Sequence, residues 1–153
     1  KILNQTLFNP ELVLKKGHYT KLKPNQKNYK DIKIGKKLIK NIKLKGVTQG
    51  VVIVDEKVII PESYKGTDHM LDKAKKKLRK HIFNRKRNGI LLKFPKPNQD
   101  LRTDLPTVGI KTLKKCVDIG LKGIVIKAGR NIFLDKKNSL KIADKNKMFV
   151  TVI

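Results

Sequence analysis

The chain has 153 residues, the size of one domain, and its 38 lysine and arginine residues outnumber 12 acidic residues to give a formal net charge of +26. Since 39% of the residues are hydrophobic, the chain can bury a core, and global disorder is excluded. No apolar run reaches the roughly 18 residues needed to span a bilayer, and the single cysteine, Cys116, excludes an internal disulfide framework and a cysteine-based zinc site.

Residues 1–30 are expected to form a linker segment that follows an N-terminal domain outside this chain, and 31–153 to form the domain itself. A helix is predicted from about Asp31 to Lys43, because apolar residues recur there at helical spacing and Asp31 can stabilise its start. Two β-branched runs, Val51–Val54 and Val58–Ile60, flank three polar residues, a pattern that predicts a hairpin.

The remaining two-thirds of the chain alternate between helical and extended patterns. The predicted elements are a helix from Thr67 into the 80s, a strand at Gly89–Phe94, a helix at Ile110–Ile119 ended by Gly120, strands at Gly123–Lys127 and Asn131–Leu134, a helix at Ser139–Lys147 and a strand at Met148–Ile153. This alternation predicts one α/β domain with a mixed, partly parallel sheet flanked by helices.

The positive charge comes almost entirely from lysine. Abundant Lys, Asn and Ile are what an AT-rich coding sequence yields, so the charge is not by itself a functional signal. Proteins that read specific nucleic-acid sequences use arginine and stacked aromatic rings, whereas only 5% of this chain is aromatic and it has no Trp. We therefore expect no specific nucleic-acid partner; an anionic membrane surface or a phosphorylated substrate remains compatible with the charge.

Some of the scarce acidic residues fall in Gly- or Pro-bearing junctions between a strand and a helix, where α/β proteins place ligand sites. These residues are Glu62, Asp68, Asp100 and Asp104. Beside the last two, Lys96 and Arg102 offer cationic donors for phosphate oxygens. Interleaved acids and bases favour metal-assisted phosphoryl chemistry, although a proline-rich turn held by local salt bridges explains the same spacing.

Four segments also resemble those of a known family. Residues 96–109 (KPNQDLRTDLPTVG) resemble a KPGQDxRxDLPxxG signature, 66–71 (GTDHML) an EGTDAML segment, 120–130 (GLKGIVIKAGR) a GLxGIAVEAGR segment, and Gln49 before the strand at 51–54 a DIGQxVVV segment. These signatures belong to LpxI-type UDP-2,3-diacylglucosamine pyrophosphatases. The matches occur in the family's order and span about residues 46–135.

The resemblance implies the family's C-terminal, catalytic-type domain. Family members use Mg²⁺ to hydrolyse UDP-2,3-diacylglucosamine to UMP and 2,3-diacylglucosamine 1-phosphate in lipid A biosynthesis, and they form homodimers. It also implies a cytoplasmic protein peripheral to the inner membrane of a Gram-negative bacterium. A lysine-rich surface suits contact with that anionic leaflet.

The resemblance also assigns residues. Asp104 is the leading catalytic or metal-binding residue, and the further metal-ligand candidates are Asp100, Asp68 and Glu62. The expected substrate contacts are Lys96, Gln99 and Arg102, while Thr67 either binds the substrate or caps its helix.

Four positions depart from the family pattern. Lys65 and Lys127 replace glutamates, Asn98 replaces a glycine, and Gly46 replaces an aspartate. If the lost acids are metal ligands, the chain is a catalytically silent relative that binds anionic lipid or RNA, and this alternative stays open. A half-protein that serves only dimerisation is a second alternative.

Overall fold

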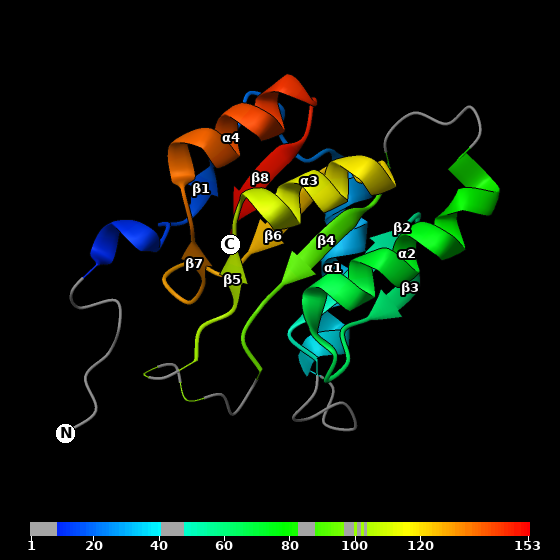
Figure 1. Ribbon diagram of the computed structural model, residues 1–153, viewed down its shortest axis with the longest axis horizontal. Coiled ribbons are helices and arrows are strands. Elements are labelled where there is room, and N and C mark those ends of the chain that lie inside the picture. Colours follow the sequence, from blue (N-terminus) through cyan, green and yellow to red (C-terminus); the bar gives the residue numbers. More distant parts are fainter. Residues whose placement is uncertain (1–8, 41–47, 83–87, 97–99, 101, 103) are drawn as a thin grey trace.

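The computed structural model describes residues 9–40, 48–82, 88–96, 100, 102 and 104–153, without the side chains of 79–82. The elements are η2 (Pro10–Leu12), β1 (Gly17–His18), α1 (Gln26–Lys40), β2 (Gly50–Val54), β3 (Lys57–Pro61), α2 (Gly66–Ile82), β4 (Ile90–Lys93), β5 (Thr107–Val108), α3 (Ile110–Ile119), β6 (Gly123–Ile126), β7 (Ile132–Phe133), α4 (Lys136–Lys145) and β8 (Phe149–Val152). Strands β1-β8-β6-β4-β2-β3 form a sheet in that order, with α2, α3 and α4 on one face and α1 on the other (Figure 1). This arrangement confirms the predicted mixed α/β domain.

The sheet has a parallel centre and antiparallel edges. Strands β4, β6 and β8 run parallel, while β2 is antiparallel to β4 and β1 is antiparallel to β8. Lys93, the last residue of β4, lies opposite Ile126 of β6 on one side and Gly50 of β2 on the other. One edge of the sheet therefore collects the ends of the parallel strands and the start of β2, which is where open α/β sheets bind ligands.

Both faces of the sheet are buried. Successive residues of the central strands alternate between two cores: Leu91 and Ile124 pack with α2, α3 and α4, whereas Leu92 and Val125 pack with α1. Strands buried on both faces read as continuous apolar runs. This is why the strand positions were predictable from the sequence.

Helix α1 begins five residues before the predicted start at Asp31, so the assignment of Asp31 to the helix start was wrong. Asn25 and Asn28 cap the first turn reciprocally, each side-chain oxygen accepting the other's backbone N–H at 3.1 and 3.0 Å. Asp31 instead lies buried within the helix and accepts the backbone N–H of Glu56 at 2.7 Å. Burial raises the pKa of this carboxyl. The contact fastens α1 to the β2–β3 turn.

Two short strands were not predicted. β1 lies inside the segment expected to be a linker and pairs with β8 at the edge of the main sheet. β5 pairs with β7 in a separate two-stranded sheet. Strands of two residues are too short to leave an alternation pattern in the sequence. The domain boundary at residue 31 stays a prediction.

Glycine is required at position 123 because the backbone there lies against the ring of Phe149. A Cβ atom at this position would lie 2.2 Å from Cε2 of Phe149, whose side chain is fully buried. Because that ring cannot move aside, we expect Gly123→Ala to lower the free energy of unfolding by about 1–3 kcal/mol. Urea denaturation measures this, with Gly120→Asn as a milder control, since Gly120 has open space around it and a left-handed backbone that Asn tolerates. Equal destabilisation by both variants would contradict the packing argument.

Candidate functional site

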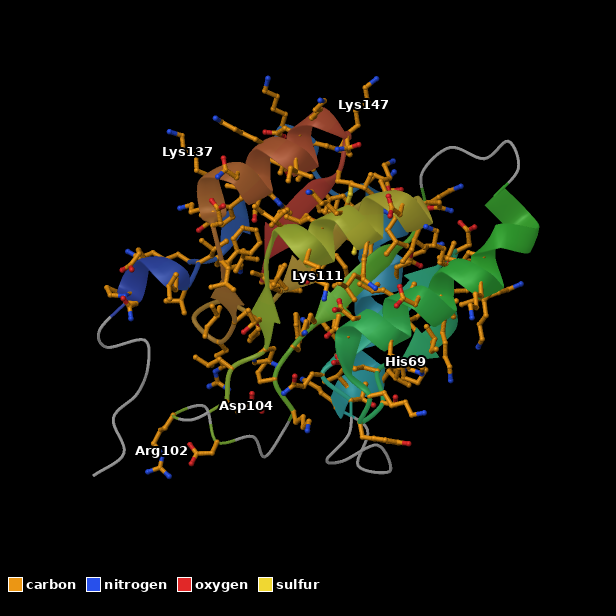
Figure 2. All side chains as sticks on the ribbon, viewed as in Figure 1. His69, Arg102, Asp104, Lys111, Lys137 and Lys147 are labelled. Carbon is orange, nitrogen blue, oxygen red and sulfur yellow. The ribbon has the colours of Figure 1, made fainter. Side chains whose placement is uncertain are left out.

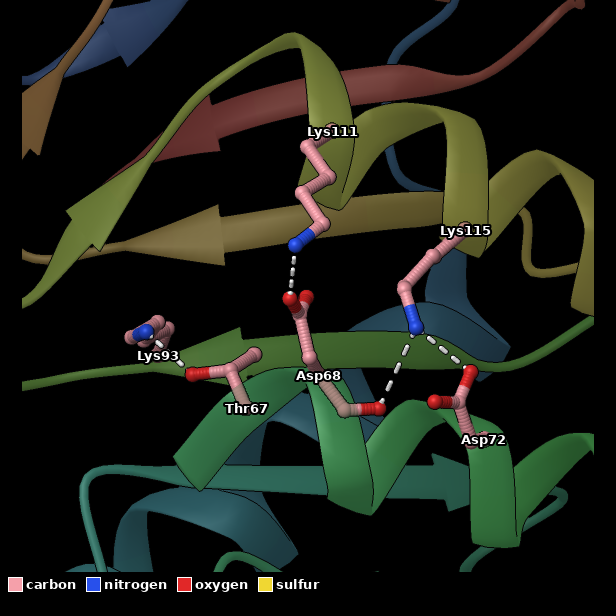
Figure 3. Close-up of polar contacts among 6 residues, drawn as sticks. All are labelled: Thr67, Asp68, Asp72, Lys93, Lys111 and Lys115. Atoms are coloured by element: carbon pink, nitrogen blue, oxygen red, sulfur yellow. Dashed lines mark hydrogen bonds and ion pairs between the residues drawn. The ribbon is translucent and has the colours of Figure 1, made fainter. Parts of the chain in front are cut away.

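A group of charged residues gathers at the edge of the sheet where β4 ends. The first turns of α2 and α3 also lie there, side by side, because Lys111 of α3 forms an ion pair with Asp68 of α2 at 2.5 Å (Figure 3). One turn further along, Lys115 binds Asp72, also at 2.5 Å. Since helix N-termini carry partial positive charge, two of them at one edge favour an anionic ligand.

Lys93 is buried at the centre of this edge, with 6% of its surface exposed. Its ammonium group donates a hydrogen bond to the hydroxyl of Thr67 (Figure 3). That hydroxyl in turn donates to Oε1 of Glu62 at 2.8 Å. Thr67 therefore bridges a buried cation and a buried carboxylate, and both hydrogen-bonding functions of its hydroxyl are used inside the protein.

Three carboxylates interact electrostatically with Lys93. Burial lowers the pKa of the Lys93 ammonium, and the negative charges of Glu62, Asp68 and Asp104 act in the opposite direction. The three acids come from separate segments, namely the end of β3, the start of α2 and the loop before β5. The fold thus brings Asp104 near the same lysine as Glu62 and Asp68, which are close together in the sequence.

The carboxylate of Glu62 is enclosed. Its Oε2 atom is buried without a hydrogen-bond partner among the described residues. A Cβ atom at Gly50 would lie 2.6 Å from this oxygen, so the glycine makes room for it. The backbone of Glu62 is also fixed, because its N–H donates to Gly50 O at 2.7 Å and its carbonyl accepts the Thr48 hydroxyl at 3.2 Å. Both the backbone and the side chain of Glu62 are therefore held rigidly at the edge of the site.

Asp104 lies on a loop whose following residues are anchored. Asn131, 1% exposed, donates hydrogen bonds from Nδ2 to the carbonyls of Lys93 (3.1 Å) and Pro106 (3.2 Å). Its Oδ1 accepts the backbone N–H of Lys127 at 2.9 Å. One buried amide thus ties together the ends of β4 and β6 and the segment after Asp104. Asp104 itself is exposed, and Gln49 donates to its Oδ2 at 3.4 Å.

Asp100 and Arg102 contact each other at the outer part of the same loop. The guanidinium donates to both carboxylate oxygens, at 2.9 and 2.8 Å, and the Arg102 backbone N–H donates at 3.0 Å. These hydrogen bonds lower the pKa of Asp100 to about 2. Figure 2 places Asp104 between Arg102 and His69 in the view shown. Of the two acids on this loop, Asp104 interacts electrostatically with Lys93, while the Asp100 carboxylate forms an exposed pair with Arg102.

Comparison with known proteins identifies the family. The family described as the LpxI C-terminal domain matches residues 15–151. This chain belongs to the LpxI family. It is 34% identical over 142 residues to the UDP-2,3-diacylglucosamine pyrophosphatase LpxI of Caulobacter vibrioides, a match that covers 92% of this chain and 50% of that relative. The chain thus spans about half the length of the LpxI relative it matches.

The fold brings together only part of the residue set assigned from the LpxI signatures. Glu62, Thr67, Asp68 and Asp104 lie around Lys93. Asp100 and Arg102 pair with each other nearby, and Lys96 follows three residues after the end of β4. Gln99 lies outside the described residues. The roles assigned to these side chains stay predictions.

Sequence reasoning missed the residues that organise this LpxI site. Lys93 is a buried polar residue at the end of an otherwise apolar strand, and Asn131 is a buried polar residue directly before β7. A lysine in the run Gly-Ile-Leu-Leu-Lys-Phe was the available signal, because lysine is almost never buried unless it is paired. Asn131 gave no comparable signal, since an asparagine two residues after Gly129 is equally at home in a turn.

The carboxylates at this edge suit a magnesium ion that is also bound by waters and substrate phosphates. No three His, Cys, Asp or Glu side chains of the described residues form a cluster that could hold a metal ion by themselves. Asp68 is partly exposed, Asp104 is exposed, and both interact electrostatically with Lys93, whereas the unpartnered Glu62 oxygen is enclosed. Mg²⁺ is commonly held by one or two carboxylates together with waters and substrate phosphates. The site therefore fits a cation that arrives with a phosphorylated substrate.

Two of the departures from the LpxI pattern can be located. The Lys127 ammonium lies 5.9 Å from the ring centroid of Phe94, directly after β4, and so adds positive charge to the site edge. The Lys65 ammonium lies 5.7 Å from the ring of the exposed Tyr64 in the turn before α2. Asn98 and Gly46 lie outside the described residues.

Proposed function

We propose that this chain is the part of an LpxI protein that hydrolyses the pyrophosphate bond of UDP-2,3-diacylglucosamine, releasing UMP and 2,3-diacylglucosamine 1-phosphate for lipid A biosynthesis. The substrate is the one in the printed name of the Caulobacter relative. The observation that carries the proposal is the group of three carboxylates around the buried Lys93, at the edge where α2 and α3 begin. Such an edge suits an anionic pyrophosphate, and its acids suit the activation of water.

Each part of the site has a proposed task in this reaction. Asp104, exposed on its anchored loop, accepts the proton of the attacking water or orients that water. The first turns of α2 and α3, with Lys96 and Arg102, attract the pyrophosphate oxygens. Lys93 and Thr67 hold the Glu62 carboxylate in place. Lys93 also adds a fixed positive charge to the site. Gln49 positions the Asp104 carboxylate through its amide.

Magnesium is proposed as the cofactor. Asp104 and Asp68 would hold it, with Asp100 as a further candidate if its pair with Arg102 opens. When bound, the ion would neutralise charge that develops on the phosphate oxygens.

The location and assembly of the protein are also proposals. No helix in the described ranges is long and apolar enough to cross a bilayer. We propose a cytoplasmic protein that contacts the inner membrane of a Gram-negative bacterium through its surface, because the substrate is an anionic lipid. An N-terminal domain of comparable size is proposed to cover the site from outside, and two copies to form a dimer.

Release of UMP from UDP-2,3-diacylglucosamine tests the function. The full-length protein and the 153-residue chain are assayed in parallel, with Mg²⁺ or with EDTA. We expect Mg²⁺-dependent release by the full-length protein and much slower release by the chain alone, since the proposed covering domain is absent. Folded full-length protein that releases no UMP would contradict the proposal.

One alternative is supported by a specific observation. Lys127 and Lys65 are lysines at positions where the family signatures have glutamates, and Lys127 lies at the site edge. A silent relative that binds anionic lipid or RNA would tolerate both changes. It would bind RNA with strong dependence on salt, and would release no UMP under any metal condition.

A further inference from the structure

A cavity lies on the opposite face of the sheet from α2, α3 and α4. It has a volume of about 600 Å³ and is bounded by α1, by Lys16–His18 at β1 and by the end of β8. Helix α1 packs on β2, β3 and β4, and the cavity lies beside it, next to β1 and the end of β8. The candidate site described above is on the other face, and none of its residues lines this cavity.

The charged lining of this cavity is of one sign. It contains five lysines, and no acidic residue is among the described residues that line it. The lysines are Lys16, Lys33, Lys36, Lys37 and Lys40. The last four recur at intervals of three or four residues on α1 and therefore share one side of the helix. Within the described part of the chain, no ion pair joins any of the five to an acid.

The same cavity has an apolar part. Ile32, which is 4% exposed, and Ile153 line it beside the lysines, and both belong to the α1-side core. Tyr29 lies on the same side of α1, one turn before Lys33, and is 47% exposed. A solvated lysine surface needs neither a hollow nor apolar lining. A cavity lined by both lysines and apolar side chains fits a ligand that is anionic at one end and apolar at the other.

We propose that this cavity binds an acidic phospholipid of the bilayer surface. The phosphate group contacts the lysines of α1, and the glycerol and first acyl carbons contact Ile32, Ile153 and Tyr29. This site would place the face of the domain that bears α1 against the membrane. The inference does not depend on the proposed hydrolysis, since it uses a separate surface.

Vesicle sedimentation with matched variants tests the site. The probes are vesicles of phosphatidylcholine, with or without about one-third phosphatidylglycerol. The test variant is Lys36→Gln/Lys40→Gln on α1, and the control is Lys73→Gln/Lys76→Gln on α2, which removes the same charge from exposed positions of the other face. We expect the α1 variant to bind the acidic vesicles about 25-fold more weakly, since each lysine at an anionic surface contributes roughly fivefold, and the control to change less than about threefold. Equal losses would overturn the proposal, because only diffuse charge would then be acting.

Two further measurements separate the lipid from other anions. Tyr29→Ser leaves the charge unchanged and is expected to weaken acidic-vesicle binding several-fold, because it removes apolar contact area at the cavity. No effect of this variant would overturn the cavity as the binding site. Inorganic phosphate at millimolar concentration and constant ionic strength should not displace the vesicles; displacement would identify a free-phosphate site instead. Thermal melts of each variant confirm that the fold is retained.

Discussion

Replacing Asp104 with asparagine is expected to lower the rate of UMP release by about 100-fold or more, with little change in stability. The side chain is exposed, so its loss of charge costs the fold little. A carboxylate that takes a proton from water contributes typically 10²–10⁴-fold to a rate. The measurement is kcat and KM of the full-length protein, together with the melting temperature.

The matched control for this variant is Asp118→Asn. Asp118 is an exposed acid on α3 whose ion pair with Lys75 lies at the far end of that helix from Lys111. The same chemical change there should leave UMP release unchanged. If Asp104→Asn keeps the parental rate, Asp104 is neither the base nor a metal ligand, and the proposed mechanism fails.

The second large effect is expected at Lys93. Lys93→Met removes the cation that faces the enclosed Glu62 carboxylate, and so leaves a buried charge without compensation. Leaving a buried charge without its compensating partner typically costs 3–5 kcal/mol, so we expect the free energy of unfolding to fall by about 3 kcal/mol. The rate of UMP release should fall by about 100-fold, because a fixed positive charge at the site is lost. Urea denaturation and the UMP assay measure the two effects.

A double-mutant cycle separates the structural part of this effect from the functional part. Glu62→Gln keeps the shape of the side chain and removes its charge. The double variant Lys93→Met/Glu62→Gln should recover most of the lost stability, because neither buried charge then remains. It should not recover UMP release, since the site still lacks its lysine. Additive losses of stability would show that Lys93 and Glu62 are not coupled. Recovery of UMP release along with stability would show that Lys93 has only a structural role.

The two faces of the sheet are proposed to carry separate tasks. The face with α2, α3 and α4 holds the acids around Lys93, while the face with α1 presents lysines around an apolar hollow. In a chain with a formal charge of +26, lysine alone is a poor guide to function. The surroundings of the lysines distinguish the two sites. Lys93 is buried beside carboxylates, whereas the lysines of the α1 cavity lie next to apolar side chains.

The sequence by itself determined the order and type of the longer elements and the family. Strands such as Gly123–Ile126 are buried on both faces, so they read as apolar runs, and Gly120 marks the end of α3 through its left-handed backbone. The acids at positions 62, 68 and 104 were also found from the sequence, because acids are scarce in this chain and these lie in junctions.

Only the tertiary structure decided which of those acids lie together. Asp100 and Asp104 are four residues apart in the sequence, yet Asp104 interacts electrostatically with Lys93 while Asp100 pairs with Arg102. Lys93 and Asn131, which organise the site, are 38 residues apart and are joined by a single side-chain hydrogen bond. Local patterns report hydrophobic periodicity and turn chemistry. They do not report which loops the sheet brings to one edge, because that depends on strand order, which forms through contacts between distant parts of the chain.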